Sequence, residues 1–160
     1  MNPDHPDPSP ERDLDHEVLT LARIARVLER ACDDLTLPQY RLLAFIVRGE
    51  ERASNLADQL ALTRPTVSAT IDTLVDRGLL ERTSIDGDRR AVRLTITPAG
   101  TDALRAAQEA MRARLDDLLS YAEDAAAVHA ALAQLTSAFP VMQATNRAAR
   151  EARRPEAASA

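Results

Sequence analysis

The fold of this chain is decided by two adjacent segments, TRPTVSATIDTLVDRG at residues 63–78 and LLERTSIDGDRRAVRLTIT at residues 79–97. The first segment has the features of a short helix, because Thr63 can cap its amino end and Pro65 suits a first helical turn. Gly78 follows, and glycine is the residue that most often ends a helix. The segment therefore predicts a short capped helix, with Val67 and Ile71 on the face that turns toward a core.

The second segment has the pattern of a β-hairpin. Leu79–Arg82 is one strand-like run, and Val92–Ile96 alternates apolar and polar residues as a half-buried strand does. Asp86–Arg90 lies between them, supplies turn residues and places two arginines at the tip. The two segments together predict a helix followed at once by an arginine-tipped hairpin.

A second short helix precedes this pair. Ser54 can cap a helix that runs through Leu60, and only Ala61-Leu62 connects it to the helix after Thr63. Two short helices with so brief a connection form a helix-turn-helix, and the hairpin adds a wing. This arrangement suits a helix in the major groove of DNA and a hairpin in the minor groove beside it.

Four longer helical patterns flank this module. The predicted fold class is mainly α with a small β-hairpin wing: a winged helix-turn-helix with flanking helices that form a dimerisation body. The predicted parts are a disordered tail at 1–12, a dimerisation helix at 13–35, the DNA-binding module at 36–97, two dimerisation helices at 98–145 and a flexible or helical tail at 146–160. Thr36 and Thr97 should cap the helices that follow them, Ser120 and Glu123 have the spacing of a capping box, and Pro140 should kink the last helix.

The apolar stripes of the first and last helices are too extensive for one small winged domain to cover. They predict a partner surface, and a second copy of the chain is the simplest partner.

Composition narrows the function further. Aromatic residues make up only 2% of the 160 residues, which argues against base stacking on single-stranded nucleic acid. The net charge is −5, yet residues 63–100 hold six arginines against five acids while residues 1–35 hold nine acids against four arginines. All twenty basic residues are arginine, whose planar fork suits phosphate and guanine. The module that would meet DNA is thus mildly positive.

Several classes of protein are disfavoured by the sequence. No apolar run approaches membrane-spanning length and no signal peptide is evident, so a soluble cytoplasmic protein without a membrane partner is expected. Cys32 is alone, so no disulfide can form within the chain. His5, His16 and His129 lack metal-site spacing, and no nucleophile elbow or phosphate loop occurs, so we expect no metal, no cofactor and no enzyme activity.

Five stretches resemble the MarR family of bacterial transcription regulators: residues 35–43, Leu56-Ala57, residues 64–68, residues 74–82 and residues 86–100. The resemblance spans about residues 14–142, and the run from the wing into Thr97-Pro98-Ala99-Gly100 is its most specific part. It implies a homodimer that presents two winged modules to a pseudo-palindromic operator in double-stranded DNA. Most such proteins are repressors that a small molecule or an oxidant releases.

The candidate DNA-binding residues follow from the helix, the hairpin and the resemblance: Arg64, Thr66, Ser68, Ala69, Thr73, Arg77, Arg82, Asp88, Arg89 and Arg90. Arg64 is suited to guanine or to a phosphate. The resemblance implies that Arg90 enters the minor groove and that Asp88 orients it. Asp72 would bring negative charge to this surface, so we expect it to pair with a neighbouring arginine, with Arg77 near enough.

The resemblance also implies an effector pocket beside the winged module, for which the polar candidates are Arg23, Arg26, Tyr40 and Arg41. These arginines are equally suited to surface ion pairs with Glu29 or Asp33. Two alternatives to a ligand-released repressor stay open: a winged-helix interaction module that does not bind DNA, and a redox-responsive regulator that acts through Cys32. Nearby acids disfavour the redox alternative, because they raise the pKa of a thiol.

Overall fold

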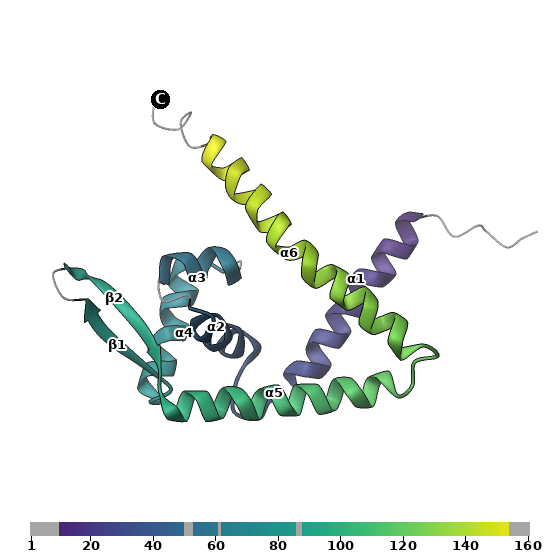
Figure 1. Ribbon diagram of the computed structural model, residues 1–160, viewed down its shortest axis with the longest axis horizontal. Coiled ribbons are helices and arrows are strands. Elements are labelled where there is room, and N and C mark those ends of the chain that lie inside the picture. The colour runs from purple at the N-terminus through teal and green to yellow at the C-terminus, as the bar shows by residue number, and fades with distance from the viewer. Residues whose placement is uncertain (1–9, 50–52, 61, 86–87, 154–160) are drawn as a thin grey trace, which may run out of the picture. The chain divides into compact units, whose positions relative to one another are not determined.

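The computed structural model describes residues 10–49, 53–60, 62–85 and 88–153 (Figure 1). The chain divides into two compact units, residues 1–115 and residues 116–160, and each is described by itself. Six helices and two strands are found in the described ranges, in this order: α1 (Pro10–Glu29), α2 (Leu37–Val47), α3 (Ala53–Leu60), α4 (Arg64–Asp76), β1 (Leu80–Ile85), β2 (Asp88–Ile96), α5 (Pro98–Leu119) and α6 (Ala125–Arg153). This confirms the predicted fold class of a mainly helical protein with a small hairpin wing.

The core of the first unit is built from aliphatic side chains of α2, α3, α4, the base of the hairpin and α5. Its buried members are Leu35, Leu42, Leu43, Ile46, Leu56, Ala57, Leu60, Val67, Ile71, Leu74, Leu79, Leu80, Leu94, Leu104, Ala107 and Met111. Val67 and Ile71, which were predicted to face the core from α4, are both in this set. Because the core reaches under the hairpin through Leu80 and Leu94, the wing is anchored at its base.

The wing is a two-stranded antiparallel sheet that lies beside α4 (Figure 1). Leu80 pairs with Ile96 and Ser84 pairs with Val92, and the register shifts between Ser84 and Ile85. Both strands extend further than predicted, so Asp88–Arg90 belongs to β2 rather than to the turn. Strand pairing accounts for this difference, because it continues beyond the residues whose apolar alternation marks a strand.

The wing joins α5 through a tight junction. Thr97 caps α5 as predicted, because its Oγ1 accepts a hydrogen bond from the Gly100 amide at 3.0 Å. The same hydroxyl donates to the Gly78 carbonyl at 2.8 Å, and the Thr97 amide donates to the Leu79 carbonyl at 3.2 Å. Gly100 is required here, since a Cβ on it would lie 2.1 Å from the Leu79 carbonyl oxygen. Gly78 itself has a φ of +70°, the left-handed conformation that suits a glycine at a helix end.

The helix caps agree with the sequence in most places. Thr36 and Gln39 form a capping box at the start of α2, and Thr63 caps α4. Residues 10–12, predicted to be part of a disordered tail, belong to α1; residues 1–9 lie outside the described residues, as do the side chain of Ser54 and residues 154–160. The helix α6 continues to Arg153, as one of the two predictions for the tail allowed.

The predicted cap of the last helix was wrong. Ser120 donates to the Asp117 carbonyl at the end of α5, and Asp124 accepts from the Ala127 amide at 2.9 Å where α6 begins. The correction has a simple cause, because the chain makes a turn at 120–124 before the second helix starts. Asp124 is as good an N-cap as serine. The helix runs through Pro140, and the kink there stays a prediction.

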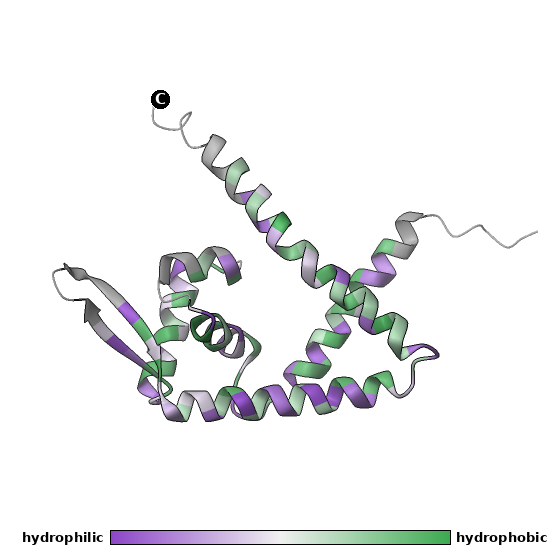
Figure 2. Ribbon diagram, in the orientation of Figure 1, coloured by the Kyte–Doolittle hydropathy of each residue, from purple (hydrophilic) through white to green (hydrophobic). Residues whose placement is uncertain are grey.

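Two helices carry large apolar side chains in solvent. Leu14, Val18 and Leu21 of α1 are 51–65% exposed, and Leu135, Phe139 and Met142 of α6 are 50–55% exposed. Figure 2 shows these helices with apolar residues interspersed along them. These are the stripes that the sequence assigned to a partner surface.

One correction concerns membrane-spanning length. Residues Ala125–Asn146 of α6 are long and apolar enough to cross a membrane by length and composition alone, whereas the sequence analysis expected no such run. This alanine-rich segment was not recognised as a long apolar run because polar residues interrupt it at intervals. A single helix of this kind is weak evidence for a membrane span, since helices of globular proteins meet the same criterion.

Candidate nucleic-acid interface

The helix α4 has one buried face and one solvent face. Val67, Ile71 and Leu74 are at most 2% exposed and fix the helix on the core. The solvent side carries the five candidates of the sequence analysis, all of which are exposed: Arg64, Thr66, Ser68, Ala69 and Thr73. The burial of one face thus leaves a polar surface of the predicted composition available to a partner.

The amino end of α4 is ordered by two threonines. The Thr63 hydroxyl accepts from the Thr66 amide at 3.3 Å, and the two hydroxyl oxygens lie 2.8 Å apart. Arg64 follows the cap and is exposed, and among the side chains that the structure describes none pairs with it. A cation at this end of the helix is placed to meet a phosphate or the acceptor edge of guanine.

Two further hydroxyls on α4 are bonded to the helix backbone. Thr70 donates to the Thr66 carbonyl at 2.8 Å, and Thr73 donates to the Ala69 carbonyl at 2.9 Å. A threonine hydroxyl has one hydrogen, so each of these oxygens has only lone pairs left for another partner.

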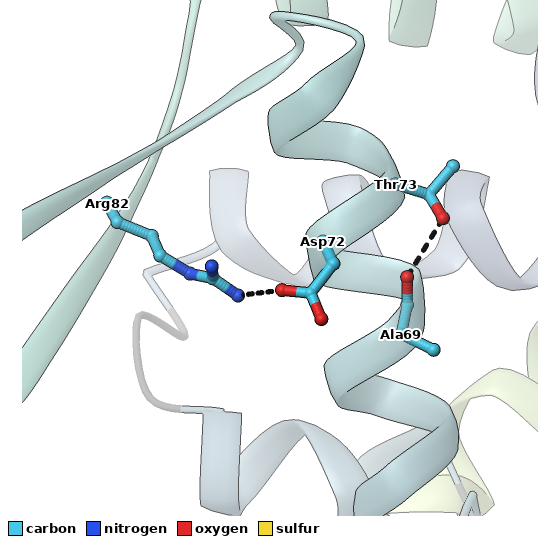
Figure 3. Close-up of polar contacts among 4 residues, drawn as sticks. All are labelled: Ala69, Asp72, Thr73 and Arg82. Carbon is cyan, nitrogen blue, oxygen red and sulfur yellow. Dashed lines mark hydrogen bonds and ion pairs between the residues drawn. The ribbon is translucent and has the colours of Figure 1, made fainter.

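Asp72 pairs with Arg82 of β1, as Figure 3 shows. An arginine partner was predicted, but Arg77 was the wrong one: Arg77 donates to the Gln39 side chain of α2 at 3.4 Å. The reason is that β1 packs against α4 and brings Arg82 to the side of the helix that carries Asp72. Arg82 therefore ties the wing to α4, and its pair with Asp72 is charge-neutral.

The wing tip lies mostly outside what the structure describes. Asp88, Arg89 and Arg90 have strand backbone in β2, but their side chains lie outside the described residues, as do Asp86 and Gly87 entirely. Their predicted roles in the minor groove stay predictions. Ser68, Arg77 and Arg82 are exposed on or beside α4, on the same compact unit as the wing.

The four effector candidates are not joined to one another. Arg23 and Arg26 are exposed on α1, while Tyr40 and Arg41 are half-buried on α2, where Tyr40 packs against the core. In the described ranges no hydrogen bond or ion pair connects these side chains, nor do the alternative ion pairs with Glu29 or Asp33 form. The effector pocket stays a prediction.

Cys32 is half-buried between the end of α1 and α5. Its thiol lies 3.7 Å from the Leu28 carbonyl oxygen and 3.9 Å from that of Ala107. Burial, followed by the charges of Asp33 and Glu29, raises the pKa of the Cys32 thiol above its ordinary value. The direction agrees with the sequence argument from nearby acids, but burial is the larger cause. In the parts of the chain that are described, no cluster of His, Cys, Asp and Glu could hold a metal ion.

Sequence reasoning missed three residues that position this surface. They are the Arg82 partner of Asp72, the Gln39 partner of Arg77, and Gly100 under the wing. The pairs join residues 10 and 38 positions apart, so no helical spacing marks them. The Thr-Pro-Ala-Gly run did mark Gly100, although not the close contact that requires it.

Residues 33–91 match the model of the MarR family. The HTH-type transcriptional regulator PecS of Dickeya dadantii is 29% identical over 127 residues, which cover 70% of this chain and 76% of PecS.

Two solved structures share the fold. The transcriptional repressor CouR, bound to a 23-mer DNA duplex, is 26% identical with a TM-score of 0.67, and the match covers 81% of this chain and 91% of CouR. The MarR family protein Rv2887 of Mycobacterium tuberculosis, in complex with salicylic acid, is 18% identical with a TM-score of 0.63, and the match covers 82% and 96% of the two chains.

Proposed function

Since this chain belongs to the MarR family of transcriptional regulators, we propose that it is a homodimeric, sequence-specific repressor that binds double-stranded DNA and that a small-molecule effector releases. The family consists of regulators, so the chain is not an enzyme, as the sequence predicted. The proposal assigns residues 36–97 to DNA, and residues 13–35 and 98–145 to the dimer.

The observation that carries the proposal is the two-faced helix α4. Its buried residues hold it on the core, and its exposed side presents Arg64 at the amino end with Ala69 and Thr73 along the middle. In a helix-turn-helix that docks on DNA, the second helix lies in the major groove and its amino end meets base edges. The wing, tied to α4 through Asp72 and Arg82, then carries Arg89 and Arg90 to the adjacent minor groove. CouR supports this mode, because its structure contains a DNA duplex.

The exposed stripes of α1 and α6 support the dimer. Side chains such as Val18 and Phe139 are more than half exposed, and solvent-exposed apolar stripes of this extent are typical of a subunit interface. A twofold dimer would place its two α4 helices about 34 Å apart, one turn of DNA, as a pseudo-palindromic operator requires. Sedimentation velocity of the full chain should give a dimer across micromolar concentrations.

An effector would release the DNA by changing the distance between the two α4 helices of the dimer. A ligand that binds better to a dimer with another distance between its α4 helices shifts the population away from the DNA-bound form. The solved structure of Rv2887, which shares this fold, contains salicylic acid, and this supports the proposal of a small-molecule effector. Arg23, Arg26, Tyr40 and Arg41 remain the candidate contacts, and a panel of phenolic acids added to the protein–DNA complex tests the effector class.

Fluorescence anisotropy with the DNA upstream of the protein's own gene tests the core of the proposal. We expect specific binding that weakens steeply with salt, since each phosphate contact contributes about 0.9 to the slope of log K against log salt. Arg90→Ala should abolish specific binding at moderate salt. Arg112→Ala is the matched control, because Arg112 is an exposed arginine of α5 outside the candidate interface.

The same titration separates the alternatives. A winged-helix interaction module would show no preference for this DNA over random duplex at low salt. The pairing of Asp72 with Arg82 weakens this alternative, because the negative charge of Asp72 on the proposed DNA surface is matched. A redox-responsive regulator would lose DNA binding on mild oxidation in a manner that Cys32→Ser prevents. The raised pKa of Cys32 disfavours that outcome.

A further inference from the structure

The middle of α4 carries methyl groups on the face opposite the core. Ala69 and Thr73 are both exposed, and Figure 3 shows them on the same side of the helix, away from the Asp72–Arg82 pair. They are four positions apart, so their Cβ atoms lie about 5–6 Å from each other. A methyl group from a partner can contact both at once, because carbon atoms pack at about 3.5–4.0 Å.

Hydrogen-bond donors are scarce on this part of the helix. The Thr73 hydroxyl donates its only hydrogen to the Ala69 carbonyl, and the Thr70 hydroxyl donates its own to the Thr66 carbonyl. Asp72 is a carboxylate that accepts only, and its charge is matched by Arg82. The middle of α4 therefore offers methyl groups and acceptors, while its arginines, Arg64 and Arg77, stand at the two ends.

Base pairs differ in the donors, acceptors and methyl groups that they expose to such a surface. Guanine exposes only the acceptors N7 and O6 in the major groove, so it needs a donor, and neither Ala69 nor the already bonded Thr73 hydroxyl supplies one. Thymine exposes its C5-methyl group, and the adenine paired with it donates from N6. Methyl groups beside a lone-pair oxygen match an A·T pair on both counts.

We propose that the middle of α4 reads an A·T base pair in each half-site, with the thymine C5-methyl packed against the Ala69 Cβ and the Thr73 γ-methyl. The Thr73 oxygen serves as an acceptor and not as a donor. This inference rests on the proposed function and adds to it the base class that this part of the helix selects.

The test pairs a missing methyl on the DNA with a missing methyl on the protein. The probe is a duplex recovered by the wild-type protein from a random library, then resynthesised with deoxyuridine in place of one thymine at a time. Replacing one thymine in each half-site should weaken wild-type binding about fourfold for each half-site changed. This factor corresponds to the free energy of burying one carbon group. Thr73→Ser, which removes the γ-methyl and keeps the hydroxyl, should weaken binding by a similar factor. It should also reduce the further loss from deoxyuridine at that position, because only Ala69 then contacts the thymine methyl.

Thr73→Val completes the comparison, because it keeps the methyl and removes the hydroxyl. It should weaken binding less than Thr73→Ser does, because the γ-methyl that packs on thymine is kept and only an exposed acceptor oxygen is lost. Thr136→Ser is the matched control for helix effects: Thr136 of α6 is exposed and makes the same bond, to the Leu132 carbonyl at 2.9 Å. Thermal unfolding of each variant excludes loss of fold as the cause.

Two results would overturn the inference while leaving the regulator intact. One is a deoxyuridine penalty of equal size for wild type and Thr73→Ser at every thymine. The other is a larger loss for Thr73→Val than for Thr73→Ser, which would make the hydroxyl the reading group. Failure of the wild-type protein to enrich any duplex from the library would instead refute the proposed function itself.

Discussion

Gly100→Ala should destabilise this protein, although the same change in most helices is stabilising. Alanine is favoured over glycine inside a helix by about 1 kcal/mol, so propensity alone would predict a gain. Here the added Cβ would lie 2.1 Å from the Leu79 carbonyl oxygen and 2.8 Å from the Ile96 side chain. Both neighbours belong to the base of the wing.

The size of the effect follows from what must move. The Leu79 carbonyl would have to retreat by about 1 Å to restore ordinary contact, and it already accepts the Thr97 amide at 3.2 Å. Overpacking costs about 1–3 kcal/mol and a lost hydrogen bond about 1 kcal/mol more. After the gain in propensity is subtracted, we expect a net loss of about 1–3 kcal/mol in the free energy of unfolding, or roughly 2–12 °C in Tm for a chain of this length.

Urea and thermal denaturation at one fixed protein concentration measure this loss. Ala99→Gly is the control, because Ala99 is the exposed neighbour in the same first turn of α5. It should lose only about 1 kcal/mol from propensity. A Gly100→Ala protein as stable as wild type, or more stable, would refute the reasoning that close approach at the wing base demands glycine.

Three further outcomes are expected. In a double-mutant cycle of Asp72→Asn and Arg82→Ala, the coupling should be at most about 1 kcal/mol of unfolding free energy and should shrink in 1 M salt, because both side chains are about half exposed; a larger, salt-independent coupling would contradict an exposed pair. Iodoacetamide should alkylate Cys32 more slowly in the folded chain than in urea at the same neutral pH, because the raised pKa reduces the thiolate fraction; equal rates would contradict it. Arg64→Ala should weaken operator binding by about 1–3 kcal/mol and relax one guanine preference in a binding selection, whereas a uniform loss across sequences would assign Arg64 to a phosphate.

Much of the fold could be predicted because its signals are local. Thr36, Thr63 and Thr97 each stand three residues before the amide or side chain that they cap, so a window of four residues contains the whole interaction. The inward faces of α3 and α4 follow in the same way from the helical period. The end of α4 was equally marked, because Gly78 takes the conformation that its residue type favours.

The missed features depend on segments that meet only after folding. For Asp72 the sequence suggested only the nearby Arg77, and its actual pairing with Arg82 depends on where β1 docks on α4. Arg77 has its partner on α2, 38 positions away. The start of α6 was predicted wrongly for a different reason: Ser120 and Asp124 both suit an N-cap, and residue type alone does not rank them.

The junction at Gly78, Thr97 and Gly100 also determines how precisely the tip of the wing is positioned. The six residues of β1 span roughly 20 Å at the usual rise per residue, so the hairpin is a lever hinged at this joint. A tilt of about 10° at the joint would swing the far end by about 3.5 Å, more than half of the roughly 6 Å width of a minor groove. Small rotations at the joint are therefore enough to move Arg89 and Arg90 into or out of register with the minor groove proposed for them, without any change in the wing tip itself.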